Sequence, residues 1–335
     1  AIVPKLGIRS HYLTQAETPG PVFSKLVPKQ SQTSKILYTM YFALTAMEVL
    51  CLKIAGMPLY DALIHSFSTA GTGGFSNRNA SVGAYDSVPV DIIITVFMLL
   101  FSINFAVYFL LLTRKWREAL ASDELRFFLT VVFGATAVLT LANLGVYSSI
   151  WESLRYTVFQ VASIISTTGF GTADFVLWPQ FSQLIIILIM FCGASAGSTG
   201  GGMKCSRILL LLRAVRREIH RITHPRSVEV VKLDGKLVSE ATLHSLLVFL
   251  GAYVITVFSA ALIISLDGFS FAVSFSAALT CVSNVGPGLE AIGPSGNFAA
   301  FSGLSKGVMS LCMIVGRLEI YPILVLFSPS TWRRT

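Results

Sequence analysis

The chain has 335 residues, of which 54% are hydrophobic and only 13% are charged. Soluble domains usually carry about 25% charged residues, so this composition excludes an ordinary soluble protein and favours a membrane protein. The net charge of +8 does not indicate nucleic-acid binding, because the basic residues cluster between long apolar runs as the positive-inside rule describes. These clusters lie at residues 5–35, 114–126 and 204–236, and at Arg333 with Arg334.

The first elements along the chain form one unit. Residues 1–34 are rich in proline, glycine, lysine and glutamine, and predict a linker on the cytoplasmic side. The apolar run 34–55 is long enough to cross a hydrocarbon core, which takes about 20 residues. A shorter apolar run follows at 60–69, and residues 88–112 predict one span that returns to the cytoplasmic side.

The same order of elements recurs twice: a long outward run, a short run and a returning span. Each short helix would begin and end on the outer side, so we expect it to be re-entrant and to lie beside a polar pathway. The three elements occupy, in order, residues 125–144, 151–165 and 178–212 (with an interruption), and then 243–266, 271–282 and 304–327.

Each short helix ends in a turn that contains a glycine. Gly74, Gly169 and Gly286 align at intervals of 95 (169 − 74) and 117 (286 − 169) residues. Glycine readily adopts backbone angles that other residues avoid, and such angles can aim successive carbonyl oxygens at an ion. One turn alone would indicate an ordinary helix-terminating glycine. Three in register, none with a carboxylate, favour a pathway for a large monovalent cation over one for calcium.

The third unit's return span is interrupted by a glycine-rich loop. Five glycines lie between Gly193 and Gly202, and each weakens a helix by about 1 kcal/mol relative to alanine. We therefore expect a broken helix. Gly197 and Gly202 have the spacing of a phosphate-binding loop, but Met203 separates Gly202 from Lys204 and no strand precedes the loop, which argues against a nucleotide site.

The remaining residue patterns do not predict an enzyme active site. His220 and His224 are four residues apart, but a basic surface fits them better than a metal site does, because no carboxylate accompanies them. The five cysteines form no Cys-x-x-Cys pair and are expected to be small buried thiols. Arg317 lies within an apolar run, where a charge usually faces a pore or a partner. Glu48 and Glu319 are weaker candidates of the same kind.

Several of these motifs together resemble the Trk/Ktr/HKT potassium-uptake family, and the bacterial Trk membrane subunits most of all. The resemblance covers essentially the whole chain. It rests on Thr-Gly-Gly-Phe at 72–75, Thr-Thr-Gly-Phe at 167–170, Asn-Val-Gly-Pro at 284–287, the glycine-rich run at 197–204 and Gly-Arg-Leu-Glu at 316–319.

The resemblance implies a fold class and an arrangement of repeats. The fold is an all-α polytopic membrane protein, in which units of membrane helix, re-entrant pore helix and membrane helix surround a central pore. Four units are expected in the family, and this sequence carries three, with the first missing. The implied divisions are 1–34 (end of the first repeat and linker), 35–112 (second repeat), 113–124 (cytoplasmic loop), 125–212 (third repeat, with a gating loop at 193–204), 213–239 (basic cytoplasmic loop) and 240–335 (fourth repeat).

The resemblance also implies the roles of individual residues. Glycine at all three visible filter positions leans towards potassium over sodium. The expected potassium filter is Thr72, Gly73, Gly74, Phe75, Thr167, Thr168, Gly169, Phe170, Asn284, Val285, Gly286 and Pro287. The expected gate is Gly197, Ser198, Thr199, Gly200, Gly201, Gly202, Lys204 and Arg317, with Lys204 at the inner mouth.

The expected function is therefore potassium uptake through a multi-pass protein of the bacterial cytoplasmic (inner) membrane, with no enzyme activity. The transported ion is K⁺, and no covalent cofactor is expected. The expected partners are a second copy in a homodimer and a cytosolic nucleotide-binding (TrkA-like) ring. Arg213, Arg216 and Arg217 could dock this ring, and membrane topology alone explains these basic residues equally well. A sodium-conducting relative and a non-conducting membrane scaffold remain the alternatives.

Overall fold

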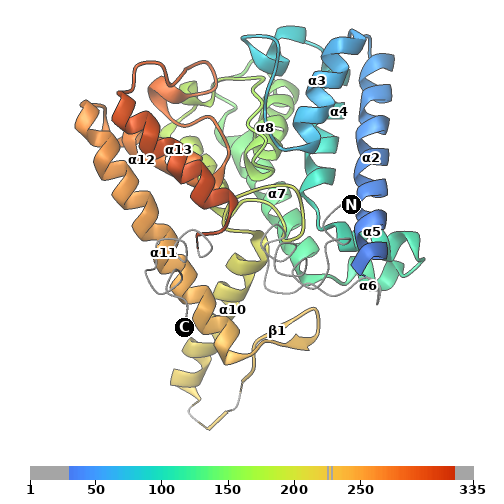
Figure 1. Cartoon of the computed structure of the whole chain (residues 1–335), viewed down its shortest axis with the longest axis vertical. Coiled ribbons are helices and arrows are strands. Elements are labelled where there is room, and N and C mark those ends of the chain that lie inside the picture. The colour runs from blue at the N-terminus through green and yellow to red at the C-terminus, as the bar shows by residue number, and fades with distance from the viewer. Residues whose placement is uncertain (1–29, 225, 228, 321–335) are drawn as a thin grey trace, which may run out of the picture.

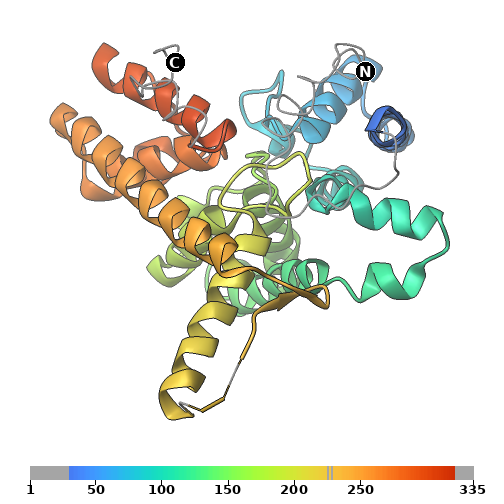
Figure 2. The same cartoon turned by 60° about the horizontal axis from the view of Figure 1, so that its bottom comes forward.

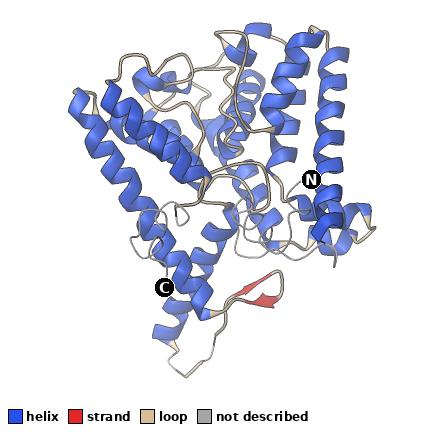
Figure 3. Cartoon of the chain, viewed as in Figure 1, coloured by secondary structure: helices blue, strands red, loops and turns tan. Residues whose placement is uncertain are grey.

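A computed structural model describes residues 30–224, 226–227 and 229–320. The linker predicted for residues 1–34 lies almost wholly outside this part of the chain. The described residues are mostly helical, and their strands are the short β1 (Lys232–Leu233) and β2 (Lys236–Leu237), which pair antiparallel (Figure 3). The expected all-α class is confirmed.

The helices fall into three similar units. The N-terminal unit contains α2 (Gln30–Ile54), α3 (Leu59–Ala70) and α4 (Val88–Ser102). The middle unit contains α7 (Asp123–Ala142), α8 (Ile150–Ile165) and α9 (Gln180–Cys192), and the C-terminal unit contains α11 (Glu240–Ile264), α12 (Phe271–Ser283) and α13 (Gly303–Arg317). In each unit the long first helix packs against the short second helix.

Consecutive units are joined by packing between their helices. Helix α4 packs against α8, and α9 packs against α12. Figures 1 and 2 show the middle unit between the other two, with the loop after α9 at the centre of the molecule. The largest buried apolar cluster joins the middle and C-terminal units, and its fully buried side chains include Phe128, Ile164, Met190, Met203 and Ile264.

Among the described residues, three helices are long and apolar enough to cross a membrane: Lys35–Ile54, Asp123–Ala142 and Glu240–Asp267. The expectation of one continuous span over residues 88–112 is wrong. Helix α4 ends at Ser102, and α5 (Phe105–Leu112) leaves it at a bend of 92°. The pair is a fourth candidate only if it counts as one broken span. Asn104 starts the new helix, because its side chain accepts a hydrogen bond from the Ala106 N–H.

The break in the third return span is confirmed. Helix α9 ends at Cys192, and α10 (Cys205–Thr223) begins after an irregular loop. Helix α10 continues through residues 213–223, which the sequence analysis placed in a basic loop. Together with α11 and the β1–β2 hairpin it forms the lower end of the molecule in Figure 1, while the short α6 (Trp116–Leu120) precedes α7.

The last return span is shorter than predicted. The apolar run 304–327 suggested one helix, but α13 ends at Arg317, and Glu319 and Ile320 have φ angles of 58° and 47°. Arg317 is therefore the last residue of α13 and is solvent-exposed. The remainder of that run, from residue 321, lies outside the described part of the chain.

Candidate functional site

The three glycine turns have the same backbone conformation. The first residue of each, Thr72, Thr167 and Asn284, is left-handed, with φ of 50°, 59° and 56°. The N–H of this residue donates to the carbonyl of the residue three positions before it. The N–H of the following residue donates to the carbonyl of the residue five positions before that one. These two bonds define a Schellman cap, whose left-handed position is usually glycine. A β-branched threonine there is an outlier of the kind that clusters at functional sites.

The aligned glycines hold consecutive turns against each other. Gly74, Gly169 and Gly286 have φ of 65°, 84° and 118°. A Cβ at Gly74 would overlap the carbonyl oxygen of Thr168, and one at Gly169 would overlap that of Val285. Gly74 and Gly169 thus admit the backbone of the next turn. A Cβ at Gly286 would meet no described atom within 4 Å.

A hydroxyl four residues before each left-handed residue ties the helix to its outgoing turn. The Ser68 hydroxyl oxygen accepts from the Phe75 N–H at 2.5 Å, and that of Thr280 accepts from the Gly286 N–H at 2.8 Å. The Ser163 hydroxyl donates to the Phe170 carbonyl at 2.6 Å. The sequence analysis missed these three residues. Extending the alignment of the three glycine turns back by four residues would have identified them, because a serine or threonine recurs at that position.

The glycine-rich loop (residues 193–204) is packed directly against the three turns. The Thr72 hydroxyl donates to the Thr199 carbonyl at 3.2 Å, and the Gly201 N–H donates to the Thr167 hydroxyl at 2.7 Å. A Cβ at Gly201 would lie 2.5 Å from the Ser283 carbonyl oxygen, beside the third turn. The structure therefore brings the expected filter and gate residues into contact.

The same loop is bonded to the bend between α4 and α5. The Ser195 N–H donates to the Ser102 carbonyl at 3.1 Å, and the Thr199 N–H donates to the Phe101 carbonyl at 3.4 Å. In return the Phe105 N–H donates to the Gly197 carbonyl at 3.2 Å. Buried backbone N–H and carbonyl groups need hydrogen-bond partners, and the bend and the loop supply them to each other.

Two of the expected gate residues carry positive charge onto loop carbonyls. Lys204 is 3% exposed, and its Nζ donates to the Gly200 carbonyl at 2.5 Å. Arg317 donates to the Thr199 carbonyl at 3.0 Å. Lys204 is thus folded back into the loop. From the sequence we had expected its side chain at the inner mouth. Beside them, Arg207 forms an ion pair with Glu319 at 2.6 Å.

The remaining expected residues lie within these turns and this loop. The Ser198 hydroxyl donates to the Ser195 carbonyl inside the loop, and Gly202 (φ 77°) lies against Gly193. Thr168 shares a hydrogen bond of 2.7 Å with Ser166. Of the aromatic positions, Phe170 is fully buried, whereas Phe75 is 76% exposed.

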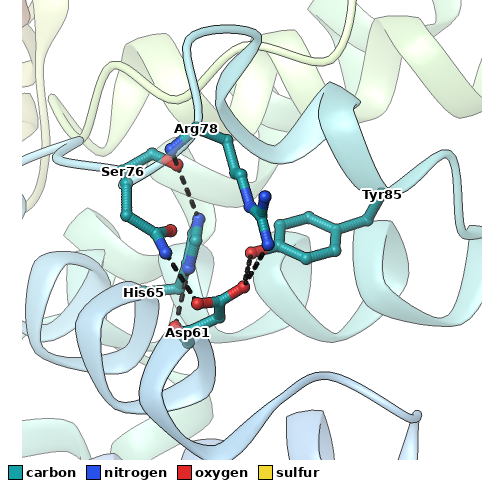
Figure 4. A network of polar contacts seen from close by, with 6 residues as sticks. Asp61, His65, Ser76, Arg78 and Tyr85 are labelled. Carbon is teal, nitrogen blue, oxygen red and sulfur yellow. Dashed lines mark hydrogen bonds and ion pairs between the residues drawn. The ribbon is translucent and has the colours of Figure 1, made fainter.

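An acidic residue on α3 organises the segment that follows the first turn (Figure 4). The Asp61 carboxylate accepts hydrogen bonds from Asn77 at 2.6 Å, Tyr85 at 2.7 Å and Arg78 at 3.2 Å. The interactions with the Tyr85 hydroxyl and with Asp61 raise the pKa of Arg78 above its ordinary value. Arg78 therefore keeps its charge, and residues 76–85 are fastened to the start of α3.

His65 connects this network to the next unit. Its Nε2 lies 3.0 Å from the Ser76 hydroxyl, and its Nδ1 lies 2.7 Å from the Asp61 carbonyl (Figure 4). The ring stacks on Phe170, with centroids 5.6 Å apart. One cluster around His65 consequently braces both the segment after the first turn and Phe170 in the second turn. The sequence did not predict this cluster.

Comparisons with known proteins show the family to which the chain belongs. The family model described as "TrkH: Cation transport protein" matches residues 1–334. The chain belongs to this cation-transport family. Trk system potassium uptake protein TrkH of Salmonella typhimurium is 38% identical over 99% of this chain and 69% of its own length, and that of Escherichia coli K12 is 36% identical with the same coverage.

A solved structure of the family has the same fold. The crystal structure of the potassium transporter TrkH from Vibrio parahaemolyticus aligns with a TM-score of 0.82 and 33% identity, covering 93% of this chain and 67% of that one. The family transports cations and is not a family of enzymes.

Proposed function

We propose that this TrkH-family chain takes up potassium across the bacterial cytoplasmic membrane, through a filter formed by the three turns. The observation that supports this most is the recurrence of one strained backbone geometry in three turns that touch each other. Strain of this kind persists where the surrounding structure enforces it, and it is typical of ion and ligand sites. The named relatives are potassium uptake proteins.

The chemistry of the turns suits a dehydrated monovalent cation. Backbone carbonyls can replace the hydration shell of K⁺ without adding net charge. Helices α3, α8 and α12 end at the turns, and the partly negative C-terminal end of a helix attracts a cation. The proposed K⁺ ligands come from residues 72–75, 167–170 and 284–287.

The glycine-rich loop is the proposed gate. It contacts all three turns, so it would block an ion that leaves them towards the α10 end. Lys204 and Arg317 add positive charge beside it, which raises the energy of a cation there. Conduction then requires the loop to move aside. The membrane potential would drive K⁺ inward by about 2.3 kcal/mol per charge per 100 mV.

The three turns contact one another in chain order. Gly74 and Gly169 each receive the carbonyl of a neighbouring turn, but Gly286 has no described atom in that position.

The α10 end is the proposed cytoplasmic face, and it carries the basic residues. Arg213 bonds to Asp123 at 2.8 Å, and Arg217 pairs with Glu240. The interaction with Asp123 raises the pKa of Arg213, so its charge persists at neutral pH. We propose that this face meets a TrkA-like nucleotide-binding ring and that the protein functions as a homodimer in the inner membrane.

Growth at low potassium tests the function. The complete gene should restore growth to bacteria that lack their potassium uptake systems, and the purified protein in liposomes should pass K⁺ in preference to Na⁺. Equal passage of both ions would identify a sodium-conducting relative. A protein that reaches the membrane and passes neither ion would contradict the proposal.

A further inference from the structure

Glu124, the second residue of α7, is a buried acid that points at the glycine-rich loop. Its side chain is 7% exposed. One carboxylate oxygen accepts hydrogen bonds from the Ala196 N–H at 2.6 Å and from the Ser206 N–H at 3.2 Å. A buried acid is rare unless it is paired or hydrogen-bonded, and the filter and the gate described above do not use this one.

The two N–H donors lie on opposite sides of the gate's glycines. Ala196 precedes Gly197 within the loop, and Ser206 is in the first turn of α10, after Lys204. One oxygen therefore holds both ends of the segment that contacts the turns. The position is electrostatically favourable, because the first N–H groups of a helix carry partial positive charge. Bonds from N–H to a carboxylate are also about twice as strong as neutral ones.

The adjacent acid has a different task, which separates the two roles. Asp123 accepts from Arg213 at 2.8 Å and from the backbone N–H of Asp234 at 2.9 Å, and so holds the β1–β2 hairpin. Glu124 has neither contact and bonds to the loop. The start of α7 thus fastens two separate segments with two successive acids.

We propose that Glu124 is a positioning residue that keeps the glycine-rich loop seated against the three turns. The proposal rests on the loop acting as the gate. Loss of the carboxylate frees the Ala196 and Ser206 N–H groups, weakens the seated conformation and favours the one that conducts. The filter is untouched, so the preference between K⁺ and Na⁺ stays the same.

The test compares K⁺ flux through the complete gene product in liposomes for four proteins. Glu124→Ala should raise the resting flux by about a hundredfold or more, as expected for losing two hydrogen bonds to a charged group, with an unchanged K⁺/Na⁺ ratio. Glu124→Gln keeps an acceptor oxygen but loses the charge, so its flux should rise by about tenfold and stay well below that of Glu124→Ala. Glu118→Ala removes an exposed acid, paired with Lys115 on α6, and should change nothing.

A second measurement covers the case in which Glu124→Ala does not fold. Glu124→Asp withdraws the carboxylate by one methylene, and hydrogen exchange of the peptide spanning residues 195–206 should then accelerate while exchange in α11 stays unchanged. Unaltered exchange in that peptide would overturn the inference.

The outcomes separate this inference from the gate itself. If Gly200→Leu changes the flux and Glu124→Ala does not, the gate stands and the role of Glu124 is wrong. If neither variant changes the flux, the loop is not the gate, and both proposals fall. A changed K⁺/Na⁺ ratio in Glu124→Ala would also overturn the inference, because a residue that positions the loop alone should not affect the filter.

Discussion

The three turns and the glycine-rich loop are both irregular and rich in glycine, but they are held in different ways. Each turn closes on its own helix: the defining backbone bonds span three and five residues, and the bracing hydroxyl lies four residues before the left-handed position. The loop is held by residues from distant elements, including Phe101, Glu124 and Arg317.

This difference separates a fixed part from a movable part. The shape of a turn is set by local bonds and by glycines that fit tightly against the next backbone, so it has few alternatives. The loop can be released by breaking contacts with its neighbours, without unfolding any helix. Segments held by few and separable contacts are those that move in proteins. Three substitutions test this difference between the fixed turns and the movable loop.

Gly169→Val should have the largest effect. The new side chain would collide with the Val285 carbonyl at a left-handed φ of 84°. Overpacking destabilises the folded turn by about 1–3 kcal/mol, and a Cβ in the left-handed conformation destabilises it by about 1–2 kcal/mol more. Potassium uptake should fall by about a hundredfold or more, measured as growth at low potassium and as flux in liposomes. Gly251→Ala is the control, because nothing lies within 4 Å of that Cβ; equal loss in both would show only a general sensitivity of glycines.

Gly200→Leu should act in the opposite direction. A Cβ there would lie 2.5 Å from the Ala194 Cβ and 2.8 Å from the Ser166 carbonyl oxygen, so the loop must shift away from the second turn. We expect the resting K⁺ flux to rise by about five- to a hundredfold, because overpacking costs about 1–3 kcal/mol and about 1.4 kcal/mol corresponds to a factor of ten. The K⁺/Na⁺ ratio should not change. A loss of selectivity would contradict the separation of the two regions, and an unchanged flux would contradict the gate.

Thr280→Val should have the smallest effect. It keeps the shape of the side chain but removes the hydroxyl that accepts from the Gly286 N–H. One hydrogen bond contributes about 1 kcal/mol net, so the K⁺/Na⁺ ratio should fall by about fivefold. Thr280→Ser restores the hydroxyl and should restore the ratio. If Thr280→Ser behaves like Thr280→Val, the methyl group is what matters and the bracing role is wrong.

The sequence predicted the regular part of the molecule well because its causes are local. The apolar runs and the glycines that end the short helices follow from composition and spacing, and the structure places α3, α8 and α12 at the predicted positions. The break at Cys192 was predictable for the same reason. The left-handed Thr72 and Thr167 were not, because threonine disfavours that conformation and no local signal asks for it.

The long-range contacts could not be predicted. Residues 88–112 read as one apolar span, and the packing of the loop against Phe101 and Ser102, together with the Asn104 cap, accounts for the bend. Glu124 is one of several acids near a basic segment, and its bonds to Ala196 and Ser206 bridge 72 and 82 residues. The burial of Lys204 likewise depends on where the Gly200 carbonyl lies.

At the bend between α4 and α5, the Phe105 N–H has two possible hydrogen-bond acceptors. In a straight helix this group would bond to the Phe101 carbonyl, four residues back. Here it bonds to Gly197 in the loop, and the Phe101 carbonyl accepts from Thr199 instead. A single N–H cannot complete the helix and hold the loop at once. Displacement of the loop therefore leaves α4 and α5 with the groups needed to rewind into one rod, so the rewound helix would recover a hydrogen bond as the Gly197 carbonyl and the Thr199 N–H of the loop depart.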